Sequence, residues 1–177
     1  MIYALSDEYF VRTLDENDLN GPYPNWFSDQ EVCLYNSHGK FFRTKTYFRE
    51  YLHTLNQNDQ IVWAICHNKD GHVGNISLQE ISFINRTAEF AIILGNKHHW
   101  GKNLGLLAGK KLLEHGFYKL NLSRIYCGTS ATNKGMIKLA HTLGMKHEGT
   151  RRQHLFLNGE RVDMLEYGIL HTEFKMD

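Results

Sequence analysis

The residue types in one short loop point most clearly to chemistry. The loop reads HHWGKNLG over residues 98–105, follows an apolar run at residues 90–94, and leads into a helical pattern that begins near Leu104. Backbone N–H groups at a helix N-terminus bind anions, and the helix dipole strengthens this attraction. The loop therefore predicts a site for a phosphate group.

The glycine spacing of this loop excludes two well-known phosphate-binding motifs. A Walker A loop needs GxxxxGK[ST], and a dinucleotide-binding fingerprint needs GxGxxG. Here Gly101 and Gly105 lie four residues apart, and Lys102 follows the first of them. On spacing alone, a glycine loop that lets a helix pack closely on a sheet explains the pattern equally well.

Glu89 is the candidate general base. It is the one carboxylate of the apolar segment at residues 88–95, beside the expected site. Removal from water would raise the pKa of such a carboxylate toward neutrality and fit it for proton transfer. A solvent-exposed charge or a salt bridge is the alternative interpretation of Glu89.

Alternating and helical patterns predict the elements that position these residues. The predicted strands lie at residues 9–13, 60–67, 73–83, 88–95, 123–130, 146–157 and 160–170. The predicted helices lie at residues 29–35, 44–56, from Leu104 onward, and at 134–143, where Gly144 ends the last one.

Two turn sequences join neighbouring strands into hairpins. Asp70-Gly71 separates two predicted strands, and Asn158-Gly159 joins the two long strands near the end of the chain. A strand–helix–strand–helix segment lies between these hairpins. We therefore expect a mixed α/β (α+β) fold, with one twisted sheet and helices on both faces, in a single domain over residues 1–177.

Composition excludes several classes of function. The 177 residues carry a net charge of +1, which gives no electrostatic case for nucleic acid or a membrane surface as partner. No apolar run approaches the roughly 20 residues of a membrane span, and the first residues lack a signal-peptide pattern. The three cysteines form no CxxC pair, so we expect a reduced, cytoplasmic protein.

Histidine is abundant, at 11 residues, but the spacing of the histidines predicts no metal site. His98 and His99 are adjacent and would point in different directions from a helix or strand, and His67 and His72 flank a turn. No HExxH pattern occurs. Surface or capping histidines are the expected explanation.

Five segments, taken in chain order, resemble the GNAT acyltransferases. The segments VGNISL and RTAEFAIILG are similar to the third and fourth strands of that family, and HWGKNLGLLAGKKLL is similar to its pyrophosphate loop and following helix. GTSATNKGMIKLAHTLGMKHEG and RRQHLFLNGERVDMLEYGIL complete the match. The last segment looks like the closing hairpin of one branch of the family. That branch contains ribosomal-protein N-terminal acetyltransferases and nucleotide-linked amino-sugar acetyltransferases.

The resemblance implies a mostly antiparallel sheet with a central splay, and acetyl-CoA as co-substrate without a metal. The backbone of Ile92, Ile93 and Leu94 would pair with the pantetheine arm and direct one N–H at the thioester oxygen. Asn133 would bond the pantetheine or a bridging water, in addition to capping its helix. The expected pyrophosphate loop comprises Trp100, Gly101, Lys102, Asn103, Leu104 and Gly105.

Two positions depart from the family pattern. Asn103 replaces the middle glycine of the loop. After glycine, asparagine is the residue that best tolerates positive φ, at a conformational cost of roughly 1 kcal/mol. Ala140 stands where many members carry the tyrosine that protonates the departing thiolate. His141, Tyr126 and Tyr167 are other candidates for this acid, or the thiolate leaves unaided.

The acceptor is expected to be a primary amine. The resemblance of the closing strands implies that this amine belongs to a nucleotide-linked amino sugar. A protein N-terminus is the first alternative, and a non-catalytic acyl-CoA-binding module is an alternative of another class. A homodimer is left open. The residues expected to contact the acceptor are Trp26, Tyr35, Asn36, His38, Arg152 and His154.

Overall fold

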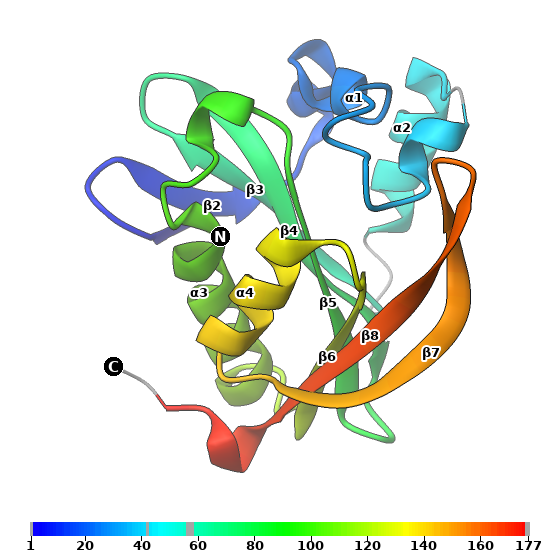
Figure 1. Cartoon of the computed structure of the whole chain (residues 1–177). Helices are drawn as coiled ribbons and strands as arrows, with labels where there is room; N and C mark the ends of the chain where they lie inside the picture. The colour runs from blue at the N-terminus through cyan, green and yellow to red at the C-terminus, as the bar shows by residue number, and fades with distance from the viewer. Residues whose placement is uncertain (1, 42, 56–58, 176–177) are drawn as a thin grey trace.

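The described residues form one eight-stranded sheet (Figure 1). The computed structural model describes residues 2–41, 43–55 and 59–175. The strand order is β1-β2-β3-β4-β5-β6-β8-β7. The strands are β1 (Ile2–Ala4), β2 (Tyr9–Thr13), β3 (Ile61–His67), β4 (Gly71–Ser82), β5 (Thr87–Leu94), β6 (Arg124–Ser130), β7 (Lys146–Leu157) and β8 (Glu160–Leu170).

The sheet is antiparallel except at its centre, where β5 and β6 are parallel. This confirms the expected mixed fold and mostly antiparallel sheet, and every predicted strand is present within two residues at each end. The three-residue β1 was not predicted, because so short a strand carries no alternating pattern. It pairs with β2 at the edge of the sheet.

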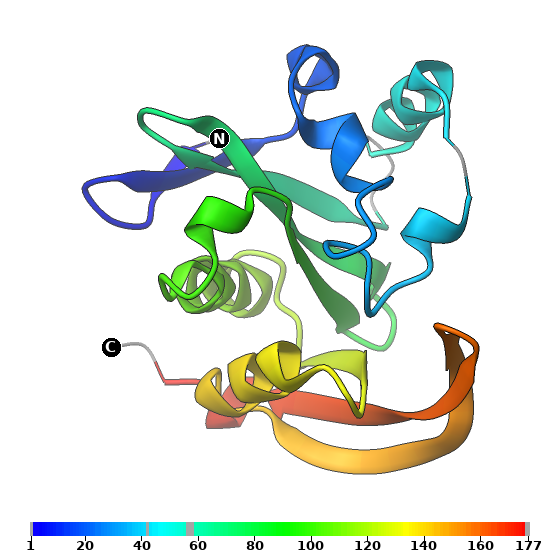
Figure 2. The same cartoon turned by 45° about the horizontal axis from the view of Figure 1, so that its top comes forward.

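Helices cover both faces, as predicted. On one face α3 (Leu104–Tyr118) and α4 (Lys134–Thr142) bury Leu112, Leu113 and Phe117 of α3 and Ala140 of α4 against the sheet. On the other face α1 (Tyr23–Trp26) and α2 (Lys45–Thr54) enclose a second apolar cluster with Val62 and Ala64 of β3. Figure 2 shows these two helical layers on either side of the strands.

The predicted helix at residues 29–35 is wrong. That segment forms turns instead, and the Asp29 carboxylate accepts the backbone N–H groups of Glu31 and Val32 in place of a continuing helix. The helix α1 lies earlier, with Pro24 in its first turn, a position that proline tolerates. The helix predicted at 44–56 is confirmed as α2, and Asn56 lies outside the described residues.

Short 3₁₀ helices complete the structure. They are η1 (Glu16–Asn20), η2 (His38–Lys40), η3 (Lys97–His99) and η4 (His171–Glu173). Asn158 and Gly159 both have positive φ, at 51° and 87°, as a two-residue hairpin turn requires. No helix among the described residues has the length and apolar character needed to cross a membrane.

Candidate active site

A cavity of about 1000 Å³ opens where β5 and β6 separate. These strands pair only from Thr87 to Glu89 on β5 and from Arg124 to Tyr126 on β6, among the described residues. Beyond Glu89 the two strands diverge, and α3, α4 and the segment before α2 contribute the remaining walls. The expected central splay is therefore present, and the cavity opens from it.

The open edge of β5 forms one wall of this cavity. Because β4 pairs with the other side of β5 as far as Leu94, the groups that face β6 have no strand partner in the described chain beyond Glu89. Ile92, Ile93 and Leu94 all line the cavity, as predicted. The Leu94 carbonyl accepts the indole N–H of Trp100 at 2.8 Å, which fixes the following loop to the end of the strand.

The loop after β5 has the backbone of an anion site. Gly101 and Asn103 have φ of 75° and 57°, so asparagine adopts the left-handed conformation that the sequence suggested. The backbone N–H groups of residues 101–105 donate to no acceptor in the described part of the chain. The first turn of α3 contains no acidic residue that would compete with a bound anion. Except for Lys102, which is exposed outside the cavity, the predicted loop residues line it.

Glu89 lies at the point where the strands separate. Its side chain is half-buried in the cavity wall, opposite Gln79 of β4. Burial raises the pKa of Glu89, and the negative charge of Glu80 raises it further, whereas Arg151 lowers it. A carboxylate with a raised pKa beside an open cavity is suited to accept a proton near neutral pH.

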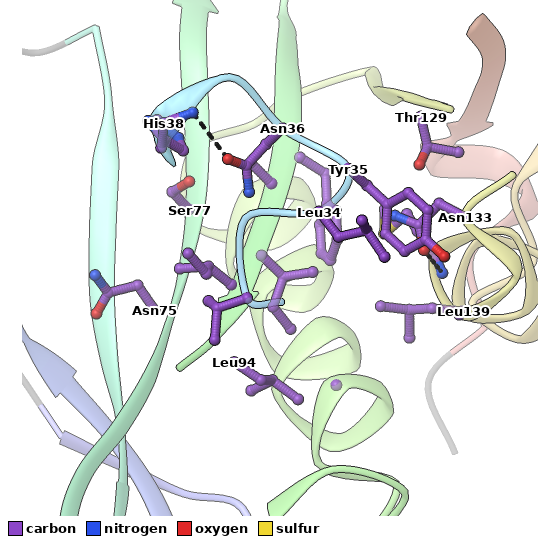
Figure 3. Close-up of a pocket in the computed structure, with 18 of the residues that line it drawn as sticks. Leu34, Tyr35, Asn36, His38, Asn75, Ser77, Leu94, Thr129, Asn133 and Leu139 are labelled. Carbon is purple, nitrogen blue, oxygen red and sulfur yellow. Dashed lines mark hydrogen bonds between the residues drawn. The ribbon is translucent and has the colours of Figure 1, made fainter. Parts of the chain in front are cut away.

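Asn133 caps α4 and lines the cavity. Its side-chain oxygen accepts the backbone N–H of Met136 at 3.1 Å, so the N-cap prediction is confirmed. The side-chain amide remains available to a ligand, since the cap uses the oxygen. Figure 3 shows Asn133 beside Leu139 at one end of the cavity, with Tyr35 projecting toward them from the N-terminal loop.

None of the three candidates for the thiolate acid lines the cavity. His141 is exposed and packs edge-on against the buried Tyr167, with 5.2 Å between ring centroids. The Tyr126 hydroxyl donates to Glu80. Ala140, in α4, is fully buried against the sheet. The tyrosines that do line the cavity come from the N-terminal third of the chain: Tyr23, Tyr35, Tyr47 and Tyr51.

The structure brings three of the six predicted acceptor residues to the cavity. Tyr35, Asn36 and His38 line it, and the Asn36 side-chain oxygen accepts the His38 backbone N–H at 2.9 Å (Figure 3). Trp26 is instead a core residue, because its ring packs directly over Gly95, where an added Cβ would lie 1.8 Å from it.

Arg152 and His154 lie outside the cavity. A bulge in β7 between Arg151 and Leu155 turns this segment away, and both side chains are exposed. Arg152 borders a separate open depression with Gln153 and Asp163. In this chain, therefore, Arg152 and His154 do not join the other predicted acceptor residues at the cavity.

A cluster of Arg43, Tyr47 and Tyr51 was missed by the sequence analysis. All three line the cavity, and the Arg43 guanidinium lies 3.9 Å from the centre of the Tyr47 ring. The Arg43 Nε atom is buried and has no hydrogen-bond partner in the described chain. The four-residue spacing of these side chains places them along one face of a helix and its entry, a signal that the sequence did contain.

The part of the cavity wall that β4 contributes is polar and uncharged. Asn75, Ser77 and Gln79 alternate along β4 and face this side of the sheet. Figure 3 shows Asn75 and Ser77 on this strand across from the segment that carries Tyr35. Glu31, another carboxylate of the wall, pairs with Lys97. The cavity can therefore bind an anion at the loop of residues 101–105. Its other walls present the polar side chains of β4 and the carboxylate of Glu89.

Comparison with known proteins gives a consistent family match. The profile described as "Acetyltransferase (GNAT) domain" matches residues 9–146. An uncharacterized N-acetyltransferase, p20, of Bacillus licheniformis is 32% identical over 105 residues, which cover 59% of this chain and 58% of p20. Spermidine N(1)-acetyltransferase of Vibrio cholerae is 31% identical over 102 residues, 58% of each chain. The chain thus spans somewhat over half the length of these relatives.

The fold matches over a greater length. The crystal structure of spermidine N-acetyltransferase from Vibrio cholerae, in complex with CoA and spermine, superimposes with a TM-score of 0.86. The match covers 95% of this chain and 98% of that one, at 24% sequence identity. At this identity the similarity shows a shared fold.

Proposed function

Because the chain belongs to the GNAT acetyltransferase family, we propose that it transfers the acetyl group of acetyl-CoA to a primary amine. One observation carries this proposal. The open edge of β5, the free N–H groups of residues 101–105 and the half-buried Glu89 all border the same cavity. A coenzyme arm, its phosphates and a proton acceptor therefore have places within reach of one another.

Each part of the cavity has a role in this proposal. The N–H groups of residues 101–105 bind the pyrophosphate, and the edge of β5 pairs with the pantetheine amides. A backbone N–H of this edge polarises the thioester carbonyl. Glu89 accepts the proton of the acceptor ammonium, directly or through water, and the free amine then attacks the carbonyl carbon. The attacking nitrogen releases its extra proton to solvent as the C–S bond breaks, and the thiolate takes a proton from solvent, since Ala140 offers none.

The cavity also suggests the class of acceptor. Arg43 supplies a cation whose Nε lacks a partner among the described residues, and the surrounding tyrosines supply flat faces for stacking. A nucleotide-linked amino sugar offers a phosphate, a flat base and an amine in one molecule. This acceptor is the one we propose, and it rests on the cavity and the closing strands, not on the names of the relatives.

Spermidine is the second candidate, because the spermidine N-acetyltransferase of Vibrio cholerae is similar to this chain in sequence and in fold. A polyamine carries several positive charges and requires carboxylates that are free to pair. Here Glu31 is paired with Lys97, and Arg43 adds a positive charge to the wall. The electrostatics of the cavity therefore favour an anionic acceptor over a polyamine.

Release of the CoA thiol from acetyl-CoA, measured over an acceptor panel, tests this function. The panel contains nucleotide-linked amino sugars, spermidine, peptides with free N-termini and simple amines. Turnover on the amino sugars alone supports the proposed acceptor, whereas turnover on spermidine or peptides alone replaces it. Binding of acetyl-CoA without turnover on any amine contradicts catalysis and favours an acyl-CoA-binding module.

A further inference from the structure

Three side chains that are distant in sequence meet beside the coenzyme loop. His67 ends β3, Asp70 lies in the turn between β3 and β4, and His99 ends η3. The Asp70 carboxylate oxygen Oδ2 lies 2.9 Å from Nδ1 of His67 and 3.1 Å from Nε2 of His99. All three ligand atoms lie within 4.8 Å of one another. Two imidazoles and a carboxylate at this spacing match the donor set of a transition-metal site.

His99 provides the second, independent observation. Its side chain is 1% exposed, and its buried Nε2 atom lies 3.1 Å from the Asp70 carboxylate without a well-aligned hydrogen bond to any group in the described chain. The other ring nitrogen, Nδ1, lies 2.8 Å from the buried Tyr9 hydroxyl. When Nδ1–H donates to the Tyr9 oxygen, Nε2 presents its lone pair to the cluster, as metal-binding histidines do.

We propose that His67, Asp70 and His99 bind one divalent transition-metal ion, such as Zn²⁺, with water completing the coordination. Asp70 is half-exposed, which gives the ion and its water a route from solvent. The mixed nitrogen and oxygen donors favour Zn²⁺, Co²⁺ or Ni²⁺ over Mg²⁺, which prefers oxygen ligands.

Two features of the cluster oppose metal binding, and the metal–ligand bonds outweigh both. The backbone N–H of Asp70 donates to Nδ1 of His67 at 3.2 Å, and the metal bond would replace this longer hydrogen bond. The exposed Lys102 side chain places a positive charge near His99, but the Asp70 carboxylate acts in the opposite direction. A metal–imidazole bond at the buried Nε2 atom of His99 compensates for the loss of one weak hydrogen bond.

The position of the site gives the ion a role. His99 lies four residues before Asn103, whereas His67 and Asp70 belong to the β3–β4 hairpin. A bound ion would join this hairpin to the segment that presents the loop N–H groups. Where the proposed function holds, an ion that fixes this segment would favour acetyl-CoA binding, and acetyl-CoA would then favour ion binding by the same factor, because such coupling is reciprocal.

Titration calorimetry of the untagged, chelator-stripped full chain with Zn²⁺ tests the site without reference to catalysis. One Zn²⁺ per chain is expected, together with the visible absorption of a tetrahedral Co²⁺ complex and no saturable binding of Mg²⁺. Asp70→Asn should weaken Zn²⁺ affinity by more than about tenfold, and Tyr9→Phe by about 10- to 100-fold. His98→Ala, which removes an exposed neighbouring histidine outside the cluster, is the matched control.

The outcomes are distinct. Absence of saturable Zn²⁺ binding overturns the proposal, as does equal binding by the wild type and the folded Asp70→Asn variant. Loss of binding in His98→Ala would show that Zn²⁺ occupies a surface site and would also overturn it. Circular dichroism of each variant shows that it is folded. Zn²⁺ binding in a chain without acetyltransferase activity would leave this proposal standing and remove the proposed function alone.

Discussion

At the scale of single residues, the environment of Glu89 explains why a glutamate in an apolar strand can act as a base. Its position is the last on β5 that pairs with β6, so its side chain is half-buried and still reaches the cavity. Burial and Glu80 both disfavour the charged form and raise the pKa of Glu89. Half-burial of this carboxylate therefore has a cost in its charged form, which the fold must tolerate.

Arg43 carries the first prediction at this scale. Arg43→Gln removes the cation of the acceptor pocket, and we expect KM for a phosphate-bearing acceptor to rise by about 10- to 100-fold, the effect of one charge-assisted hydrogen bond. The value of kcat and the affinity for acetyl-CoA should remain unchanged. Steady-state kinetics with saturating acetyl-CoA measure this split.

Arg49→Gln, on the exposed face of α2, is the matched control and should leave KM unchanged. With spermidine as acceptor the sign reverses, since loss of a positive charge would lower KM for a polycation. An unchanged KM for the phosphate-bearing acceptor in Arg43→Gln would contradict the role of Arg43.

The sequence revealed the site residues that are local to one motif. The loop at residues 98–105 and Glu89 lie on contiguous segments whose patterns predict a strand, a turn and a helix. The Arg43 cluster and the His67–Asp70–His99 cluster were missed, because tertiary contacts between separate elements bring these side chains together. Trp26 was misjudged because an aromatic residue in a loop gives no sign of whether it stacks on a ligand or fills a core.

At the scale of elements, the loop between β5 and α3 depends on two residues with left-handed backbone. Gly101 has φ of 75°, and a Cβ there would meet no atom within 4 Å. Gly101→Ala therefore adds backbone strain of roughly 1–2 kcal/mol without a clash. We expect acetyl-CoA affinity to fall by up to about tenfold as the loop relaxes away from this conformation.

Calorimetry with acetyl-CoA measures this loss. Gly21→Ala, at a glycine with negative φ far from the loop, is the control and should bind acetyl-CoA like the wild type. Asn103→Gly should bind at least as well as the wild type, because glycine removes the strain of asparagine at positive φ. Unchanged affinity in Gly101→Ala would mean that the loop conformation does not govern coenzyme binding.

Elements were predictable where local patterning and turn chemistry agreed. Hairpins with Asp70-Gly71 and Asn158-Gly159 set the boundaries of four strands, and the structure confirms them. The prediction of a helix at residues 29–35 was wrong because the Asp29 side chain competes for backbone N–H groups. Composition alone does not show this competition. The central splay came from the family resemblance, since no pattern in β5 or β6 marks where two parallel strands cease to pair.

At the scale of the whole molecule, a buried ionic network connects the N-terminal segment to the sheet. Asp18 in η1 is 5% exposed and pairs with Arg12 of β2 at 2.6 Å and with His72 of β4 at 3.0 Å. Burial by itself would raise the pKa of Asp18, but the hydrogen bonds from Arg12 and the close contact with the His72 imidazole outweigh it and hold this pKa well below its usual range. This network helps to fix the segment that carries the acceptor wall.

Asp18→Asn should lower the free energy of unfolding by about 3 kcal/mol, because it leaves the Arg12 charge without its partner. The sign of the pH dependence follows from the lowered pKa. The stabilisation is fully present above the ordinary pKa of aspartate, about 3.9, and is lost as pH falls through the lower pKa of the folded state. Urea denaturation of the wild type and the variant at several pH values measures both effects.

Glu16→Gln is the control for this network. Glu16 is exposed and lies 3.7 Å from the exposed His53, so its loss should change the free energy of unfolding by less than about 1 kcal/mol. Equal destabilisation by Asp18→Asn and Glu16→Gln would contradict a special role for the buried network.

The pH–rate profile of acetyl transfer, for the wild type and Glu89→Gln, tests the central claim most directly. The wild type should lose kcat/KM as pH falls through the raised pKa of Glu89, at a higher pH than the value of about 4.3 for a free glutamate. Glu89→Gln should lack this limb, lose about 10²- to 10⁴-fold in kcat and retain its affinity for acetyl-CoA. It should also be at least as stable at neutral pH, because a raised carboxylate pKa lowers stability as pH rises. Wild-type turnover and an unchanged profile in a folded Glu89→Gln variant would contradict the mechanism.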